Sequence, residues 1–325
     1  MTKPQQLRLL QYDVIPAIDG YSFVTSALES SDQWRDATAA HVSDRAAQSF
    51  QRAIAAALDE ILAPDGPSPD NVHEARRCLK RARAALRLMR PAVGEPSFAD
   101  EDARLAACGR SFAAVREADV LLATLSRLGE RYMPPPIVDE LAPLTQLIRG
   151  RRDAARPTAA ALAENARILR GSGDRLDLGS RVPMKTSSLE KGLRAIYRRG
   201  RKTHASASAS PNAQSLHGWR KQAKYFADAV DALGDAARKR QQKRARLARR
   251  IGDWLGEHHD LAMVDQLVHE NADLISTRAR QTLSTLLAVR QRKLRRRALR
   301  AGRRLYSAKA RRIAALLHTR VTRVV

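Results

Sequence analysis

Most of the chain carries apolar residues at the three- and four-residue spacing of an amphipathic α-helix. Segments with proline and glycine interrupt this pattern, most clearly at residues 64–69 and 134–136, and the polar stretch from Gly171 to Pro183 is typical of a linker. Residues 1–30 show little periodicity and are expected to form an extended leader. We therefore expect helices at residues 31–62, 70–91, 100–131, 137–170, 187–204, 214–234, 236–271 and 276–318, with the alanine- and serine-rich segment 205–211 between the fifth and the sixth.

The order of these elements, four helices, a linker and four helices, indicates an internal duplication. A shift of 141 positions places residues 118–122 on residues 259–263, and it aligns two arginine-rich runs. Helices of this length with short connections pack as antiparallel bundles. We expect an all-α fold of two four-helix bundles related by a pseudo-twofold axis, with residues 31–180 and 181–325 as the two halves and a basic groove or cavity at the centre. The aligned runs place Arg149, Arg151, Arg152 and Arg156 on Arg290, Arg292, Lys293 and Arg297.

The strongest sequence feature is a motif that occurs once in each half, with 144 positions between the two histidines. Both copies read hydrophobic-His-x-x-Arg-(Arg/Lys)-x-x-Lys. Spacings of three, four and seven residues return to the same side of an α-helix, so each copy places one imidazole and three cations on one face. The two sets, here called the first and the second stripe, are His73, Arg76, Arg77 and Lys80, and His217, Arg220, Lys221 and Lys224.

A solvated charged face is the ordinary explanation for such a stripe. Two observations favour a binding site instead. Exposed helical faces usually mix charges of both signs for mutual support, yet the first stripe, which Arg87 extends, has no acid on it before Arg90. The stripe is also repeated, although Asp228 and Asp231 partly neutralise the second copy. Guanidinium and ammonium groups on one face suit phosphoryl oxygens.

The charge balance points to a polyanionic partner. The chain of 325 residues has 59 Lys and Arg against 34 Asp and Glu, a formal net charge of +25. Aromatic residues make up only 4% of the chain, which agrees with a helical protein. Two cysteines make no disulfide framework, and no apolar segment is long enough to cross a membrane. A cytoplasmic protein is expected.

Other clusters carry weaker signals. The last 48 residues hold 16 Lys or Arg and no acid, and a shorter basic patch on residues 194–202 includes Arg198 and Lys202. Both are either solvated faces or walls of an anion-binding groove. Residues 257–260 read Glu-His-His-Asp, but neighbouring helical side chains diverge by about 100°, which disfavours a metal site. Asp119 and Asp260 are instead expected to orient a cation of a stripe. No phosphate-binding glycine loop, nucleophile motif or zinc-type cysteine pair is present in the sequence.

The two motifs, with residues 116–121 after the first and 255–261 after the second, resemble the CHAD family, the conserved histidine α-helical domain. The resemblance covers roughly residues 30–320. It implies two pseudo-symmetric four-helix bundles and a basic surface or cavity that binds inorganic polyphosphate through the two stripes. Ala227 departs from the family, which often has a basic residue there, whereas Arg83 fills the matching place in the first half. Many members also carry a triphosphate-tunnel domain with a Glu-x-Glu-x-Lys motif; none occurs here, so a stand-alone module is expected.

Together these observations favour a non-enzymatic polyphosphate-binding protein, associated with polyphosphate granules or storage. The alternative is a nucleic-acid-binding protein, for which the stripes offer few stacking aromatics beyond Tyr225. A phosphohydrolase would need a set of carboxylates for a divalent metal, which the sequence does not offer. No catalytic residue, metal or cofactor is expected, and the oligomeric state is left open. Beyond the two stripes, the expected contact residues are Arg83, Arg87, Tyr225, Arg149, Arg152, Arg198, Lys202, Arg290, Lys293 and Arg297.

Overall fold

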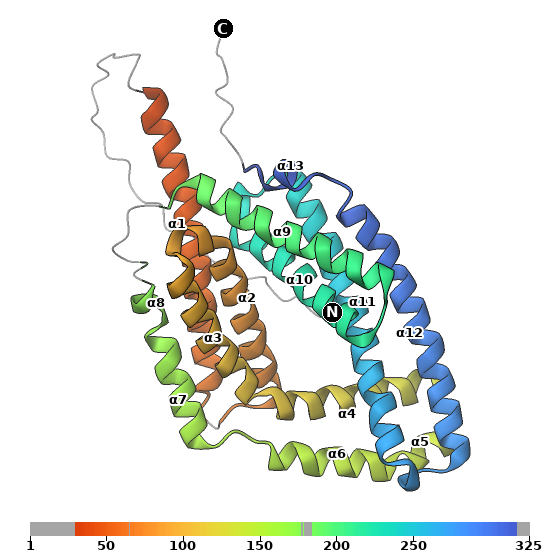
Figure 1. Cartoon of the computed structure of the whole chain (residues 1–325). Coiled ribbons are helices and arrows are strands. Elements are labelled where there is room, and N and C mark those ends of the chain that lie inside the picture. Colours follow the sequence, from red (N-terminus) through yellow and green to blue (C-terminus); the bar gives the residue numbers. More distant parts are fainter. Residues whose placement is uncertain (1–29, 65, 177, 179–183, 317–325) are drawn as a thin grey trace, which may run out of the picture.

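The computed structural model describes residues 30–64, 66–176, 178 and 184–316, and every regular element in these ranges is helical (Figure 1). The expected leader at residues 1–30 lies almost wholly outside them. The first part contains α1 (Ser30–Ile61), α2 (Pro69–Val93), α3 (Glu95–Ser111), α4 (Ala113–Tyr132), α5 (Pro135–Glu140), α6 (Ala142–Ala154), α7 (Ala159–Arg170) and α8 (Ser172–Arg175). The second part contains α9 (Thr186–Ala209), α10 (Ala213–Ala232), α11 (Lys239–Glu270), α12 (Thr277–Leu305) and α13 (Ala310–Ala314), with short 3₁₀ turns at Gly234–Ala236 and Ala272–Leu274.

Several expected helices are divided. The one expected at 100–131 bends at Phe112, which is fully buried and separates α3 from α4. The one expected at 137–170 becomes α5, α6 and α7, because Pro143 starts a new helix and Pro157 stops one. The last, expected at 276–318, ends at Leu305 and is followed by α13. The segment 205–211 is helical as far as Ala209, so the expected break lies closer to Pro211.

Matching caps begin the two helices that carry the stripes. Ser68 starts α2 with a capping box, in which its hydroxyl accepts a hydrogen bond from the Asn71 backbone N–H at 3.2 Å. Asn212 starts α10 in the same way with Ser215, at 2.9 Å. Each cap lies five residues before the stripe histidine. The two helices therefore begin at equivalent places, which gives both stripes the same position along their helices.

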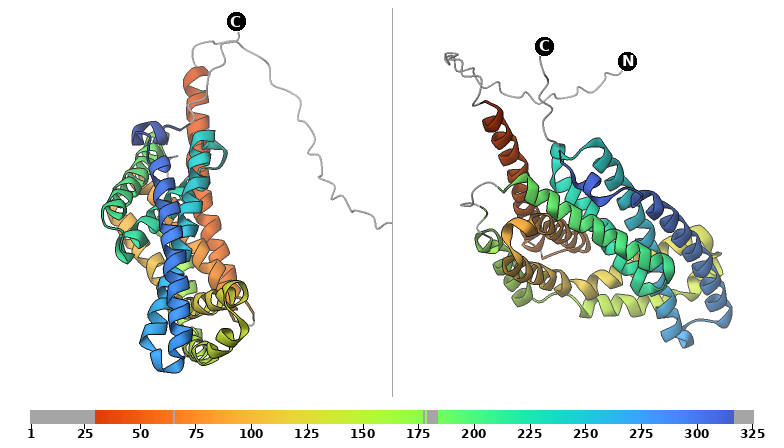
Figure 2. Two further views of the ribbon diagram at one scale, coloured as in Figure 1. Left: turned by 90° about the vertical axis from the view of Figure 1, so that its right-hand side faces the viewer. Right: turned by 45° about the horizontal axis from the view of Figure 1, so that its top comes forward.

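The hydrophobic side chains form two cores. The first joins buried residues of α1, α2, α3, α9 and α10 with the first half of α11 and the end of α12. The second joins α4, α5 and α6 with the second half of α11 and most of α12. In Figure 1, α4 and α6 run across the base of the molecule to reach α11 and α12. The molecule is narrower when seen from the side (Figure 2).

Both cores contain helices from before and after residue 180, so neither belongs to one half of the sequence. The bend at Phe112 explains this arrangement: α3 contributes Leu105 and Cys108 to the first core, whereas α4 contributes Leu121 and Leu125 to the second. The internal duplication and its two symmetric bundles stay predictions, while the all-helical fold of the described residues agrees with expectation.

One glycine sets how closely α2 and α9 approach. A Cβ atom on Gly192 would overlap the carbonyl group of Leu88 in α2, with 2.8 Å to its carbon atom. This obstacle is backbone within a helix and cannot rotate away. Close contact between α2 and α9 therefore requires glycine at this position.

We expect Gly192→Ala to lower the free energy of unfolding by about 1–3 kcal/mol, because the added methyl group overpacks the α2–α9 contact. Gly150→Ala in α6 is the matched control: nothing lies within 4 Å of a Cβ there, and alanine should stabilise the helix by about 0.5–1 kcal/mol. Urea denaturation measures both. Equal effects of the two substitutions would show that the helices do not meet at Gly192.

Candidate functional site

The two stripes lie on the first halves of α2 and α10, helices that pack against each other. Behind the first stripe, Val72, Ala75 and Leu79 are buried in the first core. Behind the second, the buried side chains are Leu216, Trp219 and Ala223. The apolar side of each helix thus fixes its rotation and leaves the stripe on the other side. His73, Arg77, Lys80, His217 and Lys221 are exposed, and Arg76, Arg220 and Lys224 are partly buried.

Five cations from three helices gather where the stripes meet, and we call them the central cation cluster. Its members come from α2, α4 and α10. Lys80 interacts electrostatically with each of the others, which shows that the two stripes meet and are not separate faces. The cluster comprises Arg76, Lys80, Arg116, Arg220 and Lys224.

Lys80 carries the clearest sign of this crowding. The pKa of Lys80 falls from 10.5 to about 8, first because the surrounding protein removes solvent and then because Arg76 and Arg220 repel a further positive charge. The side chain is still accessible to solvent. Among the described residues, no carboxylate lies within 4 Å of its ammonium group. An incoming anion would therefore relieve repulsion at this point.

The two stripe histidines are neutral near pH 7. Loss of solvent is the largest cause that lowers the pKa of His73 below 6.5, and the charge of Arg116 is the next. Loss of solvent also lowers the pKa of His217, together with His259 of α11. The His217 and His259 rings meet edge to face, 5.3 Å between centroids. A neutral imidazole can still donate one hydrogen bond to an anion.

Two glycines of α11 make room for the second stripe. A Cβ atom on Gly252 would lie 2.9 Å from Cγ of Lys224, and one on Gly256 would lie 3.4 Å from Nε of Arg220. The Lys224 ammonium is 4.0 Å from Asp253. Sequence reasoning overlooked this pair, although its four-residue spacing places both glycines on one helical face.

Arg220 has a buried donor without an acceptor. Its Nε atom is buried and makes no hydrogen bond among the described residues. Asp260 is near enough to raise the pKa of the Arg220 guanidinium, but loss of solvent outweighs this and lowers it. A buried unpaired donor costs about 1–3 kcal/mol. The Nε atom lies beside Gly256 of α11.

Arg76 of α2 and Arg116 of α4 are two further members of the central cation cluster. The Arg76 guanidinium donates a hydrogen bond to the Gly109 carbonyl at the end of α3, which ties α2 to α3. Arg116 follows on α4 and lowers the pKa of both His73 and Arg76, in each case after loss of solvent. Arg116 was absent from the expected contact residues, although it opens the segment 116–121.

The acidic residues near the stripes differ in the cations that they contact. Glu74, next to His73, accepts from Arg77 at 2.7 Å, so the first stripe is not free of acids. Asp119 forms no ion pair with a stripe among the described residues, and its buried Oδ2 atom has no donor. Asp260 interacts electrostatically with Arg220 but forms no ion pair with it among the described residues. Asp231 pairs with Arg249 of α11.

Three expected contact residues are engaged elsewhere. Arg83 and Arg87 both bind Asp102 of α3 at 2.7 Å. Tyr225 is only 4% exposed, and the Arg87 guanidinium covers its ring at 4.1 Å from the centroid. The three side chains hold α2, α3 and α10 together. They present neither a free charge nor an open ring, so we leave them out of the contact set.

Of the remaining expected residues, three have contacts outside the central cation cluster. Arg290 binds Glu257 at 2.6 Å, and Arg152 lies 3.4 Å from Asp153. Arg297 lines a separate hollow between α11 and α12. None of these residues is among the main causes of the lowered pKa of Lys80. Exposed positions on their own helices are held by Arg149, Arg198, Lys202 and Lys293.

The described residues contain no group of three or more His, Cys, Asp or Glu side chains placed to hold a metal ion. A search of the same part of the chain for a helix long and apolar enough to cross a membrane also found none.

Comparison with known proteins assigns the chain to a family. The sequence model of the CHAD domain matches residues 45–269, which include both stripes and α4. A crystal structure of the CHAD domain from the plant Ricinus communis shares the fold, with a TM-score of 0.58 and 22% sequence identity over 85% of this chain and 93% of that one. The search of curated proteins gave no significant match. The match over more than half of the sequence shows that the chain belongs to the CHAD-domain family.

Proposed function

We propose that this protein binds inorganic polyphosphate at the central cation cluster and does not catalyse a reaction. The single observation that carries the proposal is the lowered pKa of Lys80, which reflects loss of solvent and the cations of both stripes and Arg116 held close together, with no carboxylate within 4 Å of the Lys80 ammonium in the described part of the chain. Folding alone gains nothing from such repulsion, so a bound anion is the simplest reason to keep it.

The chemistry of the cluster suits a phosphate polymer. The guanidinium groups of Arg76, Arg116 and Arg220 can each engage phosphoryl oxygens in pairs, while Lys80 and Lys224 act as point charges. His73 and His217 add neutral donors at either side. We expect the polymer to bridge the two halves of the sequence, with one stripe from each.

A nucleic acid is the less suitable ligand for this cluster. Sequence-tolerant binding of single strands relies on aromatic side chains that stack on bases. Tyr225, which directly follows Lys224 of the second stripe, is covered by the Arg87 guanidinium. Membership of the CHAD family also favours inorganic polyphosphate over a nucleic acid as the ligand. We further propose a cytoplasmic protein associated with polyphosphate granules.

Competition between ligands tests this proposal. Labelled long-chain polyphosphate should bind at physiological ionic strength, and an excess of tRNA or duplex DNA should displace it poorly. All three affinities should fall as salt rises, because each polyanion releases counterions. The measurement is fluorescence anisotropy in one buffer at several salt concentrations. If tRNA or duplex DNA competes as well as polyphosphate itself, the proposed specificity is wrong.

Charge reversal within the stripes tests the site. The double variant Lys80→Glu with Lys221→Glu should bind polyphosphate at least about 100-fold more weakly, since two charge-assisted contacts contribute about 1.5–3 kcal/mol each. Both side chains are exposed, so circular dichroism should show unchanged helicity. The double variant Arg104→Glu with Arg170→Glu, at exposed positions on α3 and α7, changes the net charge by the same amount and is the control. An affinity loss equal to that of the control would mean that the stripes are merely solvated faces.

The proposal also predicts a pH dependence. Because the pKa of Lys80 is about 8 without ligand and an anion would raise it, the contribution of Lys80 to polyphosphate affinity should be constant below pH 7, and the affinity should fall between pH 8 and pH 10. Lys80→Met should bind more weakly at pH 7 and lose most of this dependence. Isothermal titration calorimetry at several pH values measures both. An unchanged slope in Lys80→Met would assign the proton to another group.

A further inference from the structure

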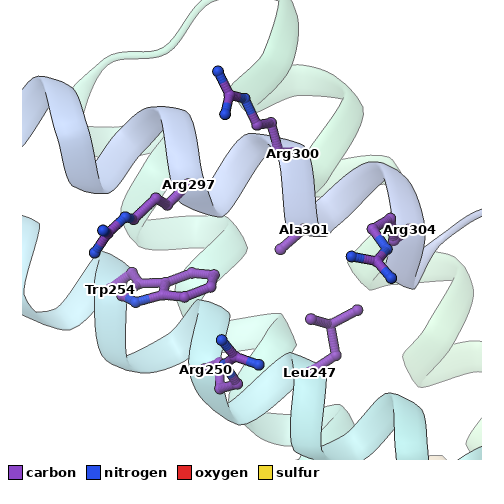
Figure 3. A pocket seen from close by; sticks show the side chains of 7 residues that line it. All are labelled: Leu247, Arg250, Trp254, Arg297, Arg300, Ala301 and Arg304. Atoms are coloured by element: carbon purple, nitrogen blue, oxygen red, sulfur yellow. The ribbon is translucent and has the colours of Figure 1, made fainter.

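A second concentration of positive charge lies between α11 and α12, in a hollow of about 510 Å³ (Figure 3). Its lining combines four arginines with an apolar surface. Volumes of this order are typical of small-molecule sites. The lining residues are Leu247, Arg250 and Trp254 of α11, and Arg297, Arg300, Ala301 and Arg304 of α12.

The hollow is separate from the central cation cluster. Gly252 and Gly256 face α10 and the second stripe. Trp254 lies between them in sequence, and at about 100° per residue its side chain leaves α11 on the other side. None of the lining residues is among the main causes of the lowered pKa of Lys80. The hollow can therefore bind a ligand of its own, independently of polyphosphate binding at the stripes.

The four guanidinium groups are unneutralised. In the described part of the chain, no carboxylate lies within 4 Å of any of them, and Glu257, three residues after Trp254, is paired with Arg290 instead. Arg297, Arg300 and Arg304 are three and four residues apart, so they form a row about 10 Å long on α12, in which the Arg300 guanidinium extends away from Trp254 (Figure 3). Like charges at these spacings disfavour the helix. A single phosphate would engage one or two members of this row, whereas two or three linked phosphates suit all of it.

Trp254 supplies an aromatic surface that the central cation cluster lacks. The indole is only partly buried and packs against both cores, which fixes its position. The Arg250 guanidinium lies over the ring at 5.3 Å from its centroid, farther than the 4.1 Å between Arg87 and Tyr225. A flat ligand ring can take this loosely held place. The displaced Arg250 would then be free to bind a phosphate.

We propose that the hollow binds a nucleoside polyphosphate, with the base against Trp254 and the phosphate chain along Arg297, Arg300 and Arg304. The aromatic surface would distinguish this ligand from inorganic polyphosphate, which has no ring to stack. Leu247 and Ala301 form an apolar floor for the base and sugar. The protein would thus carry two anion sites of different chemistry on opposite sides of α11.

Calorimetry with four probes tests the proposal: ATP, tripolyphosphate, adenosine and a single-stranded decanucleotide. ATP should bind at least about tenfold more tightly than tripolyphosphate, and adenosine should not bind measurably. Trp254→Ala should weaken ATP about tenfold, the effect of losing one stacked base, without changing the affinity for tripolyphosphate or for long-chain polyphosphate. Arg300→Glu should weaken ATP at least tenfold, whereas Arg104→Glu should leave it within about twofold of wild type.

Two further measurements keep the test decisive. Since Trp254 contacts both cores, Trp254→Phe serves as the milder variant, and it should retain most of the ATP affinity with unchanged helicity. The Lys80→Glu, Lys221→Glu double variant should lose polyphosphate and keep ATP, which separates the two sites. Equal affinity for ATP and tripolyphosphate, with no effect of Trp254→Ala, would overturn the proposal. So would a decanucleotide that binds far more tightly than ATP and depends on Trp254, because the hollow would then bind nucleic acid.

Discussion

The packing of α2 against α10 is the contact on which the proposed polyphosphate site depends, because it brings two cationic faces together. Loss of solvent and repulsion between the cations both oppose this contact, and both lower the pKa of Lys80. The opposing force lies behind the stripes, where Leu79 and Trp219 are buried in the first core. Full burial of a large apolar side chain stabilises by about 1.5–3 kcal/mol, so a few such residues outweigh a screened repulsion at the surface. The stripes are thus held in place by the apolar side of the same helices.

The sequence predicts the helical elements well where hydrophobic periodicity and caps agree. The bounds of α1, α2, α10 and α11 lie within a few residues of those expected. It does not predict the division of α3 from α4, since Phe112 continues the apolar pattern and nothing local marks a bend. The bend results from tertiary packing, in which the chain leaves one core and enters another. For the same reason the sequence does not predict that the two cores combine its halves.

The site shows a similar limit. Helical spacing places all eight stripe residues on two faces, and the structure brings those faces together at Lys80. The same spacing also included Arg87, but Asp102 comes from a different helix and pairs with it. Which cation stays unpaired depends on neighbours that periodicity does not identify. Arg116 and the glycine pair of α11 were overlooked for the same reason: their importance arises from contact with α2 and α10.

The structure also separates two kinds of positive charge that the net charge of +25 combines. Helix α11 lies between them: its glycines face the second stripe, and its Trp254 faces the arginines of α12. The surface formed by the stripes offers only polar groups to a ligand: imidazole, ammonium and guanidinium. It has no open ring on which a base could stack. The second offers guanidinium groups around an indole. A ligand that has only phosphates can pair with every kind of group on the stripes. In the hollow between α11 and α12, the same ligand would leave the apolar lining uncovered. The difference in lining therefore provides a physical basis for two ligands on one basic protein. Helix α11 contacts both surfaces, because it packs against α10 on one side and α12 on the other.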